Sequence, residues 1–194
     1  MKKFLLVLVL SLFVVGSAFG FDGVRKGFVL GGGLGFGLSS YTVKLSDPFV
    51  SIESDRENRF SFMTDFKIGY APTNQVEIVY SNKSAWFKGD GYVLNTLTFL
   101  HGLSTASVNY YLKPEGPTFF LSGGLGLASL SDPFENNPES WYGFGFYVGG
   151  GYEIIKHYAV VFDLMYGIPS DTQFGVEATY KGLTPRVTFV ATAF

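Results

Sequence analysis

Cysteine is absent from this 194-residue sequence, and charged residues make up only 15% of it. The missing thiols exclude disulfide frameworks, cysteine–zinc sites and cysteine nucleophiles. The formal net charge of −2 offers a nucleic acid no electrostatic attraction, so we expect no nucleic-acid partner. Low charge combined with 21 Phe and 12 Tyr also argues against a disordered chain.

Long apolar runs are scarce, and the one near the N-terminus is short of the length that a membrane-spanning helix needs. Met1–Lys3 carry positive charge, residues 4–15 (FLLVLVLSLFVV) are apolar, and residues 16–20 (GSAFG) offer small side chains for cleavage. We therefore predict a secretory signal peptide over residues 1–20 and one domain over residues 21–194. The mature chain is then either a soluble secreted or periplasmic β-protein or a transmembrane β-barrel.

Helical periodicity is also missing, whereas alternation with a period of two recurs along the chain. In residues 60–70 (FSFMTDFKIGY), Phe, Ile and Tyr occupy most even positions, while Ser, Asp, Lys and Gly occupy most odd ones. Because no crossover helix separates the strands, neighbours must run antiparallel. The predicted strands cover residues 27–38, 60–70, 75–81, 104–112, 118–129, 143–153, 158–166 and about 184–194.

The predicted connections alternate in length. Three are short, at residues 71–74, 113–117 and 154–157, and four are long, at about 41–58, 82–92, 130–142 and 167–183. Short turns at one rim and long loops at the other are typical of outer-membrane barrels. The sequence therefore predicts an all-β fold, an eight-stranded antiparallel up-and-down transmembrane β-barrel.

Glycine decides which face of each strand meets lipid. In residues 27–38 (GFVLGGGLGFGL), Phe and Leu share one face and glycine dominates the other. A soluble barrel should expose Lys, Glu, Thr and Gln on its outer face, and glycine is a poor choice there. The lumen of an eight-stranded barrel is only just wide enough for side chains, so small residues fit inside it. We expect the apolar face to meet acyl chains and the glycines to line the lumen.

Three segments resemble a known group of proteins: residues 106–128 (ASVNYYLKPEGPTFFLSGGLGLA), residues 144–154 (FGFYVGGGYEI) and the C-terminal Phe194. The group is the small eight-stranded outer-membrane barrels of the OmpA/OmpX type and their glycine-rich relatives. The resemblance extends over essentially all of residues 21–194, and it specifies fold better than activity. It implies the outer membrane of a Gram-negative-type bacterium, contact with outer-membrane lipids and lipopolysaccharide, and recognition of Phe194 by the assembly machinery. Phe194 departs from the alternation of Val187 and Phe189, which leaves the register of the last strand open.

Five charged residues fall on the face assigned to the lumen: Asp65, Lys67, Glu77, Asp163 and Arg186. Buried ions require partners. We expect these residues to form ion pairs that tie neighbouring strands together and close the pore; the alternative is a gate or a narrow ion path.

Tyrosines cluster beside the short turns with the parity of the apolar face. They are Tyr70, Tyr110, Tyr152 and Tyr158. A phenol ring there keeps its hydroxyl in the headgroup layer, so we predict an aromatic girdle. Trp86 and Phe60 are candidates for the opposite rim.

Catalytic and metal-binding patterns find little support. His101 and Ser104 are three residues apart on one strand and therefore face opposite sides, and His157 lies in a short turn. The loops hold acidic groups without the dense spacing of a calcium loop, namely Asp47, Glu53, Asp55 and Glu57, and then Asp132, Glu135 and Glu139. We expect no enzyme activity, no cofactor and no metal.

These patterns predict a monomeric barrel with a structural or surface-interaction role and its long loops outside the cell. Two alternatives stay open. One is a narrow porin-like channel or a conduit for small hydrophobic molecules, and the other is a soluble lipocalin-like binder with the apolar face turned inward.

Overall fold

The computed structural model describes residues 24–90, 96–135, 138–173 and 175–194. The predicted signal peptide over residues 1–20 lies outside these residues. Within the described ranges, no helix is long and apolar enough to cross a membrane.

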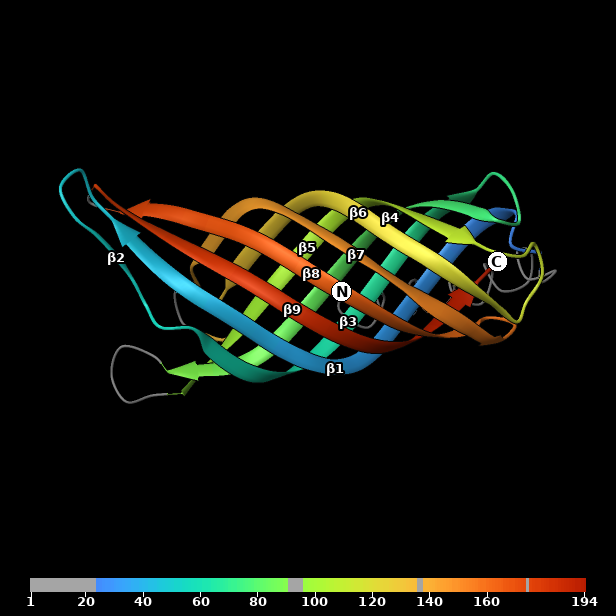
Figure 1. The fold of residues 1–194 in the computed structure, drawn as a ribbon, viewed down its shortest axis with the longest axis horizontal. Helices are drawn as coiled ribbons and strands as arrows, with labels where there is room; N and C mark the ends of the chain where they lie inside the picture. The colour runs from blue at the N-terminus through green and yellow to red at the C-terminus, as the bar shows by residue number, and fades with distance from the viewer. Residues whose placement is uncertain (1–23, 91–95, 136–137, 174) are drawn as a thin grey trace, which may run out of the picture.

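Antiparallel strands close into an eight-stranded barrel, because β1 pairs with β3 on one side and with β9 on the other. Figure 1 shows the strands wound obliquely around the long axis. A ninth, short strand, β2, pairs with the last residues of β1 at one end of the molecule. The strands are β1 (Gly27–Ser46), β2 (Ser51–Glu53), β3 (Glu57–Ala71), β4 (Val76–Asp90), β5 (Thr96–Tyr111), β6 (Thr118–Ser131), β7 (Ser140–Ile155), β8 (Tyr158–Gln173) and β9 (Val176–Ala193).

Strand register sets the tilt of the barrel. A row of paired residues that starts at Leu34 on β1 passes through every strand and returns to β1 at Lys44, ten residues further on. Such a stagger requires strands that are strongly tilted against the barrel axis. The outward apolar stretch of β1 runs from Phe28 to Leu38. It measures about 33 Å along the strand, and at the usual tilt it rises about 25 Å, which is the height of a lipid-facing band.

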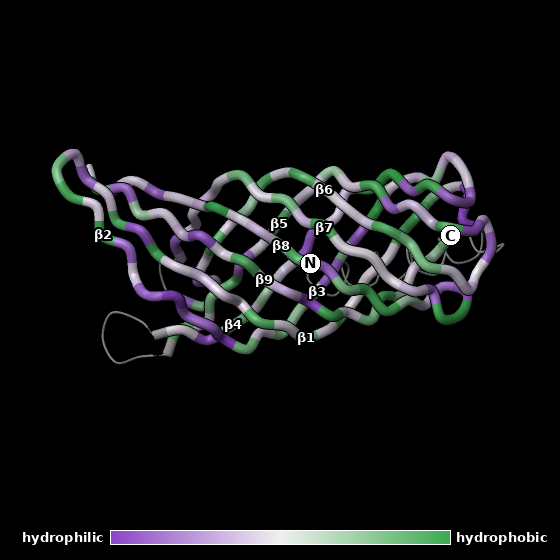
Figure 2. Tube along the Cα trace, viewed as in Figure 1, coloured by the Kyte–Doolittle hydropathy of each residue, from purple (hydrophilic) through white to green (hydrophobic). Residues whose placement is uncertain are grey.

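The polarity of the barrel is inside out. Large apolar side chains point outward from every barrel strand; Phe28, Leu34 and Phe162, for example, are 58%, 60% and 62% exposed. Their neighbours of opposite parity, including Lys83, Asp163 and Arg186, are buried in the lumen. Figure 2 shows hydrophobic and hydrophilic residues interspersed along the strands. This arrangement confirms the predicted fold class and the predicted direction of the apolar face.

Strand lengths differ from the prediction at one end of the barrel. The predicted loop over 82–92 is largely strand, because β4 continues to Asp90, and the predicted loop over 167–183 is almost entirely the hairpin of β8 and β9. The predicted loops over 41–58 and 130–142 are also shorter than predicted, because the strands on either side extend into them. The short turns lie close to their predicted positions. We call the two ends the short-turn rim and the long-hairpin rim.

The physical reason for the difference is a change of surroundings along each strand. On β1 the residues that continue the outward parity beyond Leu38 are Ser40, Thr42 and Lys44, so the apolar alternation ends while the backbone pairing continues. The apolar pattern marks the band that meets lipid, and hydrogen bonding extends the wall beyond it.

Glycine is required where two strands approach closely at the β1–β9 seam. A Cβ added to Gly35 would collide with the backbone carbonyl of Val187. Gly32 faces outward, and a Cβ there would meet only the Asp65 carbonyl at 3.5 Å, an ordinary contact.

We therefore expect Gly35→Ala to lower the free energy of unfolding by ~1–3 kcal/mol, the usual cost of overpacking. Gly32→Ala should leave it almost unchanged. Denaturant unfolding of both variants in lipid vesicles checks this expectation, and equal effects of the two substitutions would contradict the assigned faces.

Candidate functional site

The lumen contains most of the buried charged side chains that the structure describes, and four of them form an ion cluster at its centre. Arg186 on β9 pairs with Asp65 on β3, and its Nη1 lies 3.3 Å from Asp163 Oδ1 on β8. Lys83 on β4 places its Nζ 2.9 Å from Asp163 Oδ2 and 3.5 Å from Asp65 Oδ2. Two cations and two carboxylates balance in charge, and the side chains of all four are less than 10% exposed, which is the arrangement that buried ions require.

Aromatic and hydroxyl groups complete the surroundings of this ion cluster. The ammonium of Lys83 lies 4.4 Å from the ring centroid of Tyr147, a cation–π contact. Thr188 donates a hydrogen bond of 3.0 Å to Asp65 Oδ2. The ion cluster therefore joins β3, β4, β8 and β9 across the barrel.

A second ion pair lies nearer the short-turn rim. Lys67 Nζ donates to Glu77 Oε2 at 3.1 Å, and Glu77 is fully buried. The same carboxylate accepts hydrogen bonds from the Asn109 amide at 2.8 Å and from the Tyr111 hydroxyl at 3.0 Å. With three donors, this carboxylate is well satisfied without access to water.

A small cavity lies between the two ionic groups. Its volume is about 50 Å³, and Lys67, Lys83, Asn109 and Tyr147 are among the residues that line it. A cavity of this size with a polar lining accommodates a few ordered waters, because about 10–15 Å³ suffices for one. It lies in the lumen beside both ionic groups.

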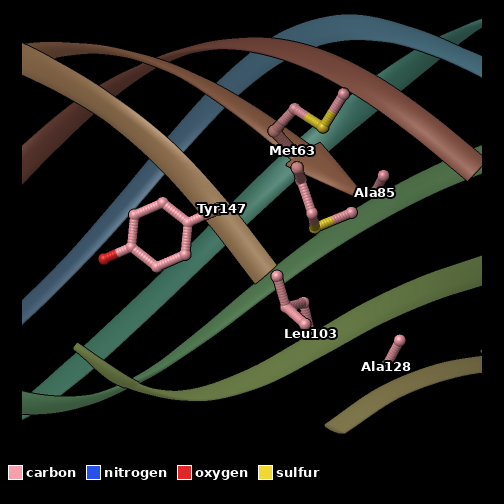
Figure 3. Close-up of a cluster of buried hydrophobic side chains, with 6 residues drawn as sticks. Met63, Ala85, Leu103, Ala128 and Tyr147 are labelled. Atoms are coloured by element: carbon pink, nitrogen blue, oxygen red, sulfur yellow. The ribbon is translucent and has the colours of Figure 1, made fainter. Parts of the chain in front are cut away.

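An apolar layer separates the ion cluster from the long-hairpin rim. Met63, Leu103 and Met165 are fully buried and pack with Ala85, Ala128 and Tyr147. Figure 3 shows the labelled members of this layer, which come from different strands. Beyond them, Tyr41, Phe87 and Tyr180 form a further buried cluster. The His101 ring contacts the Tyr180 ring in a T-shaped arrangement, with 5.1 Å between the ring centroids. Of these groups, the ionic ones thus lie toward the short-turn rim and the two apolar clusters toward the long-hairpin rim.

Arg25, which precedes β1, lies across the short-turn rim. Its guanidinium pairs with Glu153 at 2.6 Å and donates to the backbone carbonyls of Asn74, Lys113 and Pro114. It also lies 4.2 Å from the ring centroid of Tyr111. One side chain thereby ties two short turns and β7 together across the mouth of the barrel.

The five charges predicted for the lumen all lie there, but the structure divides them into two groups. Asp65, Asp163 and Arg186 belong to the ion cluster, and Lys67 and Glu77 form the separate pair. Sequence reasoning missed two cations. Lys83 falls within the loop predicted over 82–92, and the residues of outward parity on either side of it, Asn82 and Ser84, are polar. Arg25 precedes the alternating pattern altogether, so no periodic signal pointed to it.

The predicted girdle residues, Tyr70, Tyr110, Tyr152 and Tyr158, all face outward beside the short turns. Tyr152 packs on Phe119 with 4.6 Å between centroids, and Tyr158 stacks on Phe189 at 5.7 Å. Their depth in a membrane stays a prediction, as does the role of the girdle.

Phe194 lies just beyond β9 with the parity of the lumen and is 4% exposed. Its ring packs against His157, with 4.8 Å between centroids. The strand before it is continuous, and Val187 and Phe189 point outward as their alternation predicted. The register of the last strand is therefore regular through Ala193, where β9 ends, one residue before Phe194.

The remaining histidine and the acidic loops show no catalytic or metal-binding arrangement in the described parts of the chain. His101 faces the lumen and Ser104 faces outward, on opposite sides of β5. No group of three or more His, Asp or Glu side chains there is placed to hold a metal ion. Glu53 instead binds the Thr42 hydroxyl and Lys181, and these contacts lower the pKa of its carboxyl.

No protein-family model matches the sequence, and no curated protein matches it. Among solved structures, the chain is similar to OprG from Pseudomonas aeruginosa, with 13% identity, coverage of 89% of this chain and 98% of that one, and a TM-score of 0.47. It is also similar to Neisserial surface protein A (NspA), with 15% identity, 84% and 97% coverage and a TM-score of 0.42. A third similar structure is Ail, the attachment invasion locus protein of Yersinia pestis, with 14% identity, 84% and 99% coverage and a TM-score of 0.41. The fold described above rests on the strand pairing of this chain itself.

Proposed function

We propose that this chain is a non-enzymatic, non-conducting barrel of a Gram-negative-type outer membrane that presents its long-hairpin rim outside the cell for surface interactions. The outward band of Phe, Leu, Val and Tyr supports insertion in lipid, because exposed side chains of this size and number meet acyl chains better than water. A soluble binder requires the opposite polarity, with the apolar residues inside.

The packed lumen is the observation that carries the non-conducting role. An ion path needs continuous polar space, whereas the lumen here is crossed by the ion cluster, by the Met63–Leu103–Met165 layer and by Arg25 at the short-turn rim. The cavity of about 50 Å³ between the ionic groups does not replace such a path.

The long-hairpin rim is the part available to partners. Its hairpins carry exposed side chains of several kinds, including Phe49, which is 93% exposed, and Arg56 and Lys88. Contact with lipopolysaccharide belongs to this proposal, because the polar strand extensions lie directly beyond the apolar band. Recognition of Phe194 by the assembly machinery also belongs to it. The ring is buried in the folded barrel, so the recognition has to precede folding.

Planar-bilayer recording tests the non-conducting role. We expect the purified wild-type protein to show no steady current, because the ionic and apolar layers leave no open path. Heat-dependent gel mobility of the same sample establishes that the barrel is folded. A steady, ion-selective current from folded protein would overturn the proposal and favour a narrow channel.

A further inference from the structure

One sector of the outer wall is polar at the depth where the rest is apolar. Along β4 the residues of outward parity run Ile78, Tyr80, Asn82, Ser84 and Trp86. The middle of the band therefore holds a partly exposed amide, Asn82, above a buried hydroxyl, Ser84, which is 6% exposed. The neighbouring β5 presents Gly102, Ser104 and Ala106 there. Other strands present Leu34, Phe146, Phe162 or Phe189 in the corresponding part of the band.

These polar groups form one hydrogen-bonded patch, which we call the β4–β5 patch. Asn82 Nδ2 donates to Ser104 Oγ at 3.0 Å, and the Ser84 hydroxyl donates to Asn82 Oδ1 at 3.1 Å. The Tyr80 hydroxyl donates to Ser104 Oγ at 3.1 Å. The side chains that give or receive these bonds all belong to the outward parity of β4 and β5, so the patch is part of the wall and not of the lumen.

The β4–β5 patch leaves hydrogen-bonding capacity unused. A side-chain amide has two N–H donors and a carbonyl oxygen with two acceptor positions. The contacts of Asn82 within the described residues use one donor and one acceptor position. Hydrocarbon offers no partner for the remainder, and unsatisfied polar groups are costly in lipid.

We propose that the β4–β5 patch is a lateral self-association surface, on which a second copy of this chain docks within the bilayer. This inference rests on the proposed membrane location, and it replaces the expectation of a monomer. An amide is donor and acceptor at once, so Asn82 of one copy complements Asn82 of the other across a two-fold axis, the usual symmetry of homodimers. Headgroups lie too far from the middle of the band to serve these groups.

Side-chain size and charge fit the same occupant. Gly102, Ser104 and Ala106 are small, which allows the two walls to approach closely, as small residues do between membrane helices. The patch carries no charged side chain, so two copies do not repel each other there. Trp86, whose Nε1 donates to the Thr64 hydroxyl at 3.1 Å, borders the patch on the side of the long-hairpin rim.

Energy transfer in lipid vesicles tests the proposal without assuming a detailed geometry. Because the chain has no cysteine, Phe49→Cys in the hairpin between β1 and β2 supplies a single labelling site remote from the patch. Copies labelled with donor and acceptor should show energy transfer that exceeds the level of random encounters and falls as lipid is added. Asn82→Leu in the same background should reduce it several-fold to the random level, whereas Phe162→Leu on β8 should not change it.

Cross-linking locates the contact. Ala106→Cys leaves the hydrogen-bonded patch intact and faces outward beside it, and Phe162→Cys is the matched outward site on β8. On oxidation with copper–phenanthroline, Ala106→Cys should give several-fold more disulfide-linked dimer than Phe162→Cys.

Equal cross-linking at both sites, or energy transfer that Asn82→Leu does not reduce, would overturn the self-association surface. Ala106→Cys that cross-links to a different protein in native membranes, and not to itself, would also overturn it. Protein that fails to float with vesicles would overturn the membrane location and the pairing together. Protein that floats but shows only random energy transfer would overturn the pairing alone.

Discussion

Leu34→Arg should lower the free energy of unfolding in lipid vesicles by ~2–4 kcal/mol, the cost of an arginine on the lipid face near the bilayer midplane. Leu34 is 60% exposed and lies in the middle of the outward apolar stretch of β1. In water such exposure would make the substitution nearly neutral. Denaturant titration followed by the fluorescence of Trp86 and Trp141 measures the effect.

Phe49→Arg is the matched control for this substitution. Phe49 is more exposed, at 93%, but it lies in the hairpin beyond the apolar band. We expect the free energy of unfolding to change little, because the guanidinium stays in water. If both arginine variants unfold like the wild type, Leu34 does not meet lipid and the assigned polarity is wrong.

Arg186→Leu should cost ~3–5 kcal/mol, because removal of one partner from a buried ion group leaves an uncompensated charge. Asp65 and Asp163 would then share Lys83 alone, and the ion cluster would carry a net negative charge. The measurement is again the free energy of unfolding in vesicles. A cost well below this range would show that water reaches the lumen and screens the carboxylates.

A double substitution separates charge from packing at this position. Arg186→Leu combined with Asp163→Leu leaves the neutral Lys83–Asp65 pair, so the double variant should be more stable than the sum of the two single effects predicts. Lys181→Met removes an exposed partner of Glu53 on the outside of the barrel and should leave the free energy of unfolding nearly unchanged, because such pairs are well solvated.

The lipid-facing part of the fold was predictable from the sequence for a physical reason. Where a strand has lipid on one side and a narrow lumen on the other, every second residue is constrained, and the alternation in residues 60–70 or 143–153 follows. Beyond the band both faces of a strand meet water or polar side chains, so the alternation fades. β8 continues to Gln173 and β9 begins at Val176. Because the alternation fades there, the sequence predicts a loop over this hairpin.

For the candidate site, the alternation along each strand predicts which residues face the lumen but not which of them contact one another. Asp65 and Arg186 were assigned to the lumen because they alternate with Phe and Val, but which charges meet depends on stagger across strands that are distant in sequence. Lys83 was not predicted as a lumen residue, because the polar residues of the β4–β5 patch interrupt the apolar alternation on the same strand. Asn82 and Ser84, which interrupt the alternation around Lys83, thus belong to the patch from which self-association is inferred.

Collision accessibility of spin labels tests the inside-out polarity most directly. With no native cysteine to interfere, single nitroxides are placed at Leu34, Leu125 and Phe162 on the outer wall and at Phe49 in the hairpin between β1 and β2. In lipid vesicles, the three wall labels should collide with oxygen and be shielded from a water-soluble nickel complex, whereas the Phe49 label should be open to the nickel complex. Wall labels that are open to the nickel complex, in protein that stays soluble without any amphiphile, would contradict the account.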